Sequence, residues 1–181
     1  MNEDSSNQSS LEKFALVANE YCTLIDSLSD ERPPQFYTDL ELLLSRLHLA
    51  ILPIIADAES TETRLTESVE IRVEKWKTIS NRIARVTNNE TNQLYDWHIN
   101  SWNTTKPKDN YCAVRASMLW DDLADIYGDL KDGLSLWDLN TDESRSEASW
   151  EWRFNFEAHW GIHLFRAAQT VHEIRYQLYM N

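Results

Sequence analysis

Five aspartates crowd one stretch of the sequence that otherwise has the pattern of a helix, "MLWDDLADIYGDLKDGL", residues 118–134. At about 100° per residue they fill an arc beside the apolar face, with Asp122 and Asp129 nearest its edge. Aspartate is a poor residue for a helix interior, and like charges three or four residues apart repel. We therefore expect the folded protein to offset this cost. The aspartates are Asp121, Asp122, Asp125, Asp129 and Asp132.

The sequence leaves three ways of offsetting that repulsion open. A divalent cation such as Mg²⁺ or Zn²⁺ can bridge Asp122, Asp125 and Asp129, with further ligands from another helix. Water can screen the charges at modest cost. Arginines of the C-terminal helix can pair with the aspartates inside the protein, and the candidates are Arg153, Arg166 and Arg175. No Glu-x-x-His occurs, which argues against a ferritin-like di-iron centre.

Two histidines, His159 and His163 in "FEAHWGIHLF", stand four residues apart and so share one helix face. This spacing suits two ligands of one zinc or iron ion, although position 160 is Trp where a metalloprotease motif has Glu. The alternative is that both imidazoles are core residues that accept or donate a hydrogen bond. If the aspartate helix packs against them, Asp122 and Asp129 are the expected partners.

Outside these two segments, the sequence offers little that indicates chemistry. Glu20 borders the apolar face of the first helix and is the best remaining acidic candidate for an inward role. There is no phosphate-binding glycine-rich loop, no GxSxG, no HExxH and no EF-hand loop. We therefore expect a non-catalytic interaction protein. The alternative is a divalent-metal-dependent enzyme that uses the aspartates, resembling nucleotide pyrophosphohydrolases at the level of fold alone.

The composition limits the class of protein. With 181 residues, 3 glycines and 4 prolines, the chain suits one domain of long helices with few turns. A formal net charge of −13 disfavours nucleic acid and favours a basic protein partner. No stretch is long and apolar enough for a membrane span, and Cys22 and Cys112 are isolated, so we expect a cytoplasmic protein. The oligomeric state stays open.

Apolar periodicity predicts an all-α fold, a mostly antiparallel bundle of about five helices. Residues 1–8 are expected to be a disordered tail, and 9–181 a single domain. The first helix is predicted to begin at a capping box at Ser9, and the second after Pro34. Two further helices are predicted over about 69–86 and 110–134. A long central helix runs from about Ser144 to the C-terminus. Residues 87–109 are expected to be a loop or a short extended segment, because apolar residues alternate there.

Four segments together resemble an uncharacterised bacterial family of all-helical proteins known as a domain of unknown function. They are "FALVANEYCTLI", "LLLSRLHLAILPI", "LWDDLADIYGDLKDGL" and "WEWRFNFEAHWGIHLFRAAQTVHEIRY". The most specific parts are the aspartate run and the His-Trp-Gly-x-His run. The resemblance implies a helical fold and a bacterial cytoplasmic setting, and it implies no activity. It makes Asp122, Asp125, Asp129, His159 and His163 worth testing together.

Overall fold

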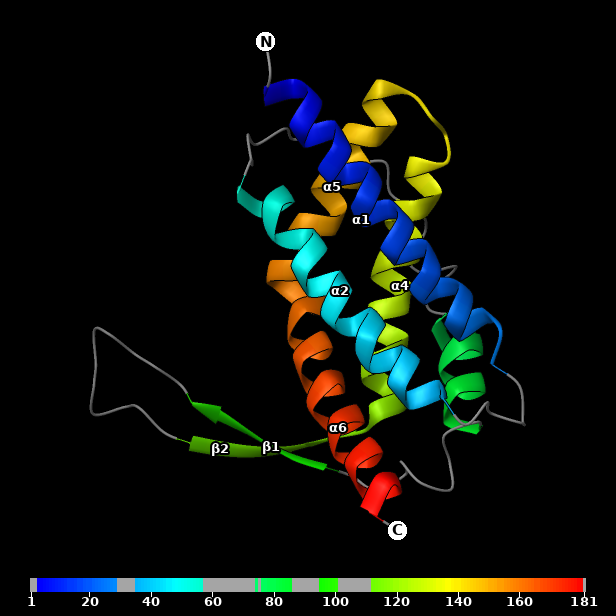
Figure 1. Cartoon of the computed structure of the whole chain (residues 1–181), viewed down its shortest axis with the longest axis vertical. Coiled ribbons are helices and arrows are strands. Elements are labelled where there is room, and N and C mark those ends of the chain that lie inside the picture. The colour runs from blue at the N-terminus through cyan, green and yellow to red at the C-terminus, as the bar shows by residue number, and fades with distance from the viewer. Residues whose placement is uncertain are drawn as a thin grey trace.

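Four long helical stretches pack side by side in the computed structural model (Figure 1). They are α1 (Glu3–Asp26), α2 (Phe36–Ala56), α4 (Leu119–Trp137) and the continuous run of α5 (Asp142–Asn155), η2 (Phe156–Trp160) and α6 (Gly161–Met180). The structure describes residues 3–28, 35–56, 74, 76–85, 95–100 and 112–180, with the backbone alone for 3–9, 95–100 and 112–117. The all-α fold class is confirmed, and a fifth helical segment, 76–85, packs at one end.

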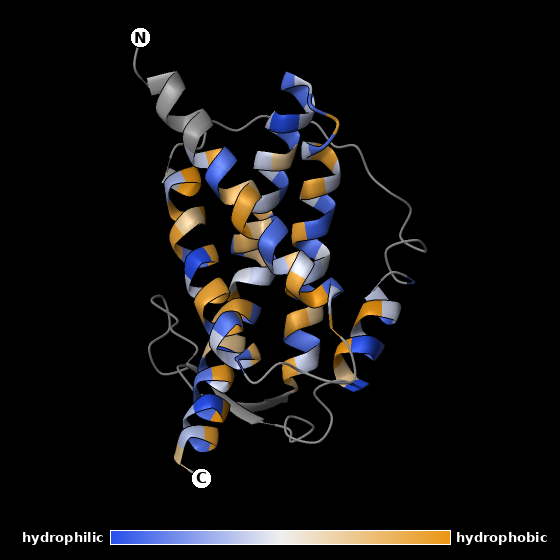
Figure 2. Ribbon diagram, turned by 45° about the vertical axis from the view of Figure 1, so that its right-hand side comes forward, coloured by the Kyte–Doolittle hydropathy of each residue, from blue (hydrophilic) through white to orange (hydrophobic). Residues whose placement is uncertain are grey.

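The four stretches alternate in direction around the bundle. α1 packs against α2 and α4, and α6 packs against the same two helices from the other side (Figure 1). Each helix mixes hydrophobic and hydrophilic residues along its length, as amphipathic helices do (Figure 2). The predicted apolar arc of α4 is buried, namely Leu119, Leu123, Ile126, Tyr127, Leu130 and Leu134. The aspartate helix therefore faces the core as the periodicity predicts.

The long C-terminal helix touches each of the other three. It packs on α2 and α4, and Phe14 of α1 meets the rings of Trp152 and Trp160, with centroids 4.9 and 6.1 Å apart. Thr141 caps its start, with the Thr141 side chain and Ser144 bonding each other's backbone N–H groups. Other large apolar residues of this helix are exposed, including Phe154, Phe165 and Tyr176. The helix therefore forms part of the outer wall of the bundle as well as part of its core.

A β-hairpin lies beside the end of the bundle where α4 begins and α6 ends (Figure 1). Strand β1 (Tyr95–Asn100) pairs antiparallel with β2 (Cys112–Ser117), from Tyr95 opposite Ser117 to Asn100 opposite Cys112. The extended segment within 87–109 is confirmed. The prediction of helix from Asn110 is wrong, because the helix begins at Leu119. The segment "CAVRAS" has residues that suit a helix, and the distant partner strand overrides that local preference.

Two helix boundaries differ from the expectations. α1 begins at Glu3, so its helical backbone extends into the stretch for which a disordered tail was predicted. α2 ends at Ala56, about one turn after Pro53, which agrees with the weak tolerance of a helix interior for proline. α4 continues past the predicted end at residue 134 to Trp137. A Cβ at Gly133 would lie 2.0 Å from Trp152 Nε1, so this glycine lets α5 approach α4 closely.

None of the described helices combines the length and apolar character that crossing a membrane requires.

Candidate metal centre

The aspartates of α4 and the two histidines meet where α4 packs against η2 and α6. Tyr21 of α1 helps to hold α4 in place, because its buried hydroxyl donates a 2.9 Å hydrogen bond to the Leu123 carbonyl. On the other side, Trp152 Nε1 donates to the Leu130 carbonyl at 3.3 Å. These bonds pin the backbone of α4 between two neighbouring helices. Because the backbone of α4 is held in this way, the carboxylates of Asp122, Asp125 and Asp129 on the same helix have fixed positions.

Each histidine has its own aspartate. His163 Nδ1 lies 2.6 Å from Asp122 Oδ1, and His159 Nδ1 lies 2.7 Å from Asp129 Oδ2. Asp122 is fully buried and the His163 side chain is 13% exposed, whereas the His159 side chain is 47% exposed. The structure therefore brings together the two carboxylate–imidazole pairs expected from the sequence. One pair is inside the protein and the other is at its surface.

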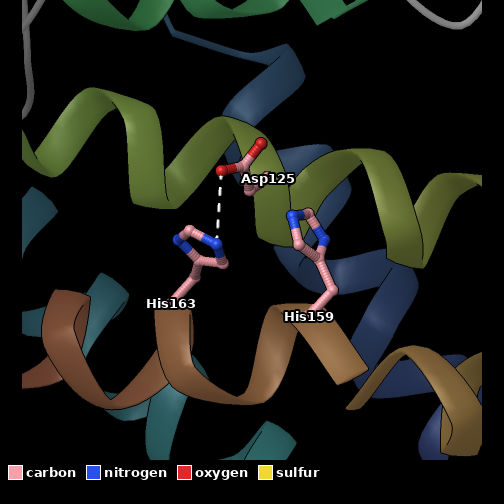
Figure 3. A group of neighbouring side chains, drawn as sticks. All are labelled: Asp125, His159 and His163. Carbon is pink, nitrogen blue, oxygen red and sulfur yellow. Dashed lines mark ion pairs between the residues drawn. The ribbon is translucent and has the colours of Figure 1, made fainter. Parts of the chain in front are cut away.

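Asp125 completes the group between the two imidazoles. Figure 3 shows His159 and His163 projecting from adjacent turns toward Asp125 on the facing helix. His163 Nε2 lies 3.5 Å from Asp125 Oδ2, and Trp76 Nε1 donates a 2.8 Å hydrogen bond to Asp125 Oδ1. One ligand atom from each of Asp125, His159 and His163 lies within 4.8 Å of the other two. Sequence reasoning did not single out Trp76, because nothing in the sequence shows that its indole N–H faces a carboxylate.

This geometry has the features of a mononuclear metal site. Two atoms that bind one tetrahedral ion at about 2.0–2.1 Å lie about 3.4 Å apart, close to the separation of His163 Nε2 and Asp125 Oδ2. Metal-binding histidines usually donate their other ring N–H to a carboxylate, a backbone carbonyl or a water. Asp122 and Asp129 occupy that position at the two Nδ1 atoms, and so leave the Nε2 atoms for an ion.

Burial and charge shift several proton affinities around this group. Burial raises the pKa of Asp122, against the opposing effect of its hydrogen bond with His163. Burial and the charge of Asp125 raise the pKa of Asp121. The hydrogen bond with Asp129 raises the pKa of His159, because it stabilises the imidazolium form. The cluster therefore combines groups whose charge states depend on one another, as candidate functional sites commonly do.

A π-helical turn carries His159. In η2 the Gly161 N–H bonds the Phe156 carbonyl, five residues back, instead of the carbonyl four residues back. A Cβ at residue 161 would lie 2.3 Å from that oxygen, so the turn requires glycine there. Single π-turns inside α-helices are frequent at functional sites. The extra residue sets the position of His159 relative to His163 on α6.

The other candidate residues lie at different distances from this group. Arg166 Nη1 lies 3.9 Å from Asp122 Oδ1, so one of the three candidate arginines approaches the aspartates. Arg175 instead forms an ion pair with Glu41. Glu20 pairs with Arg46 of α2 and is not brought to the cluster. Asp132 lies at a pocket beside it.

That pocket has a volume of about 670 Å³ and lies between α4 and the helical segment 76–85. Asp125, Asp129 and His159 line it on the side of the cluster, and Trp76, Ile79 and Tyr127 are among its other walls. Two of the three candidate ligands, Asp125 and His159, are therefore reachable from a space large enough for a small molecule.

The fold and the cluster together define a helical-bundle protein with a His₂Asp group at a helix interface. The chain belongs to the DUF5063 family, a domain of unknown function, whose model matches residues 5–177. The predicted membership of a helical family without known activity is thereby confirmed. The chain is also similar to the crystal structure of protein BF1032 from Bacteroides fragilis, with 21% identity, a TM-score of 0.64 and 91% of each chain covered. This likeness shows the fold alone. No curated protein matches the chain.

Proposed function

We propose that this protein binds one divalent transition-metal ion through Asp125, His159 and His163. The main support is that one ligand atom from each of these residues lies within 4.8 Å of the other two. In addition, each imidazole contacts a separate carboxylate at its Nδ1 atom. Three of the five aspartates that repel one another in sequence thereby gain partners. The proposal supports the enzyme alternative over the expectation of a purely non-catalytic protein.

The donor set favours some ions over others. Imidazole nitrogen suits Zn²⁺, Fe²⁺, Co²⁺ and Ni²⁺, whereas Mg²⁺ prefers oxygen ligands and retains several waters. A pyrophosphohydrolase-like Mg²⁺ site would take carboxylates from at least two helices, but here the second helix presents histidines. The expected occupant is therefore Zn²⁺ or another transition ion, and Mg²⁺ is disfavoured.

Three protein ligands suit reactive chemistry better than a purely structural role. Structural zinc sites are closed by four protein ligands, while catalytic sites keep a position for water or substrate. An ion in such a site lowers the pKa of a bound water toward neutrality, which supplies a hydroxide nucleophile. Here the side chains of Asp125 and His159 also line the adjoining pocket. A hydrolytic reaction on a small molecule in that pocket is the activity that this arrangement supports best.

Thermal melts of the chelator-stripped protein with and without added metals test the proposal. Because a bound ion stabilises the native state by mass action, an excess of about 100-fold over the Kd adds about 2.7 kcal/mol. In a chain of this size that raises the Tm by roughly 5–10 °C. We expect this response to Zn²⁺ or Co²⁺ in the native sequence, and a much smaller one to Mg²⁺.

Matched variants separate a specific site from general binding to acidic groups. Asp125→Asn and His163→Gln should lose the metal response. His172→Gln should keep it, because His172 pairs with Glu41 on the outer side of α2 and α6, away from the cluster. A Tm that none of these ions moves would contradict the proposal. His163, with Asp122 at one nitrogen and Asp125 at the other, would then be a structural imidazole between two carboxylates.

A second candidate is the interaction protein expected from the net charge of −13. Because Asp122, Asp125 and Asp129 already bond to histidine or tryptophan side chains of the same chain, this candidate depends mainly on the other acidic residues. A basic protein partner would be the binding target.

A further inference from the structure

Gly128 is the one of the three glycines that packing inside the protein does not explain. A Cβ at Gly133 would collide with the Trp152 indole, and one at Gly161 would collide with the Phe156 carbonyl. A Cβ at Gly128 would meet no heavy atom within 4 Å among the described residues. A helix with glycine in its interior is less stable than the same helix with alanine. At Gly128 no close packing contact in the described part of the chain explains why glycine is present.

The space over Gly128 is the pocket beside the metal centre. Gly128 lines it in the middle of α4, between Tyr127 and Asp129 in the chain, and Trp76 and Ile79 face it from the helical segment 76–85. A glycine lets another molecule approach the backbone more closely than any side chain allows. The bare backbone at this point therefore suits an occupant that fills the pocket down to the helix.

The charges around the pocket restrict what that occupant can be. Four carboxylates line it, Glu74, Asp125, Asp129 and Asp132, against Lys131 and the imidazole of His159, which pairs with Asp129, among its described lining residues. Lys131 also lies 3.4 Å from an Asp26 oxygen and 5.7 Å from the centre of the Tyr127 ring, so its charge is already partnered. This field opposes anions such as phosphates and attracts cations.

We infer that the pocket binds a small organic amine, with its apolar body over Gly128 between Trp76 and Tyr127 and its ammonium group toward the carboxylates. Aromatic walls suit both parts, because an aromatic ring attracts apolar groups and cations. The inference goes beyond the metal proposal. It concerns the space next to the ion and holds whether or not an ion is bound.

The test uses phenethylamine and hydrocinnamate, which share a phenyl-ethyl body and carry opposite charges. Each is titrated into the full-length protein in the presence of EDTA, with the indole N–H signal of Trp76 in NMR spectra as the reporter. Phenethylamine should shift this signal saturably, and hydrocinnamate should bind more weakly by roughly tenfold or more. Because the metal is removed, the result does not depend on the metal proposal.

Graded substitutions place the amine over Gly128. Gly128→Ala should raise the Tm yet weaken phenethylamine binding, and Gly128→Leu should weaken it further, by roughly tenfold or more in total. Ser45→Ala, on the exposed face of α2, adds alanine to a helix elsewhere and should leave the binding unchanged. Equal binding of both probes, no saturable shift, or binding that Gly128→Leu leaves intact would each overturn the inference. A negative result in the metal-binding test would not affect the inference of an amine site.

Discussion

At the scale of single residues, the two aspartate–histidine pairs have the same chemistry and different surroundings. The Asp122 side chain is fully buried against His163, while Asp129 contacts a histidine that is about half exposed. A buried charge-assisted hydrogen bond is costly to break, because the remaining partner is left without solvent. An exposed pair is largely screened by water. The two pairs should therefore contribute very differently to stability.

Asp122→Asn should lower the free energy of unfolding by about 1–3 kcal/mol. The matched change Asp129→Asn should cost about 0.2–1 kcal/mol. Urea denaturation with EDTA present measures both without any contribution from metal. If Asp122 orients His163 for an ion, Asp122→Asn should also weaken metal binding by about 10–100-fold while leaving all three ligands in place. A larger loss of stability for Asp129→Asn than for Asp122→Asn would contradict this ranking.

At the scale of elements, Asp26 ties together three helical segments. Its carboxylate accepts hydrogen bonds from Arg82 of the segment 76–85 at 3.0 Å and from the Tyr127 hydroxyl of α4 at 3.0 Å, and lies 3.4 Å from Lys131 Nζ. The segment 76–85 carries Trp76 to Asp125, so this network also supports one wall of the candidate site. Partial burial works to raise the pKa of Asp26, but the hydrogen bonds from Arg82 and Tyr127 outweigh it and lower the pKa.

This lowered pKa predicts a specific dependence of stability on pH. A carboxylate with a depressed folded-state pKa stabilises the protein fully above its unfolded pKa, about 3.9, and loses that effect as the pH falls through the folded value. The native sequence should therefore be more stable than Asp26→Asn by a constant amount above about pH 5, and the difference should shrink below about pH 4. Denaturation series at several pH values measure it, and Asp138→Asn, an exposed carboxylate outside the network, gives the background effect. A difference that grows on acidification would contradict the assignment.

At the scale of the whole molecule, acidic residues exceed basic ones by 13, from 30 against 17. Ion pairs such as Glu20 with Arg46 and Glu41 with Arg175 join neighbouring helices, but each takes one acidic and one basic residue and so leaves this excess unchanged. The unmatched charge gives the protein a long-range negative field, which steers cations and basic proteins toward it. Both the candidate metal centre and the pocket over Gly128 lie within that field.

If a basic protein is the partner, its binding should depend strongly on salt. We expect affinity capture with the tagged full-length chain to retain one basic protein at low ionic strength. It should be released as salt approaches about 1 M, where the Debye length is about 3 Å. Quantitative mass spectrometry across a salt series measures the retention. A retained protein that is acidic, or whose retention ignores salt, would contradict electrostatic binding.

The sequence by itself indicated the main helices of the bundle and their buried faces, but not all of their boundaries. Apolar periodicity is a local property of the chain, so the buried arc of α4 and the shared face of His159 and His163 follow from helix geometry alone. It also indicated that Asp122 and Asp129 lie closest to the core, which holds for Asp122, with a fully buried side chain, but not for Asp129, which is no more buried than Asp125. The resemblance of the aspartate and histidine runs to a helical family agrees with the family match.

Only the tertiary structure decided which side chains meet across the helix interfaces. In the folded protein Asp122 pairs with His163, and Asp129 pairs with His159. Asp125 lies beside Trp76, whereas Glu20 pairs with Arg46 away from the cluster. It also replaces the expected first turns of the α4 helix by strand β2, because a strand is stabilised by a partner distant in sequence. Such contacts depend on how helices rotate and slide against one another, and a small rotation changes every pair without altering the periodicity that the sequence displays.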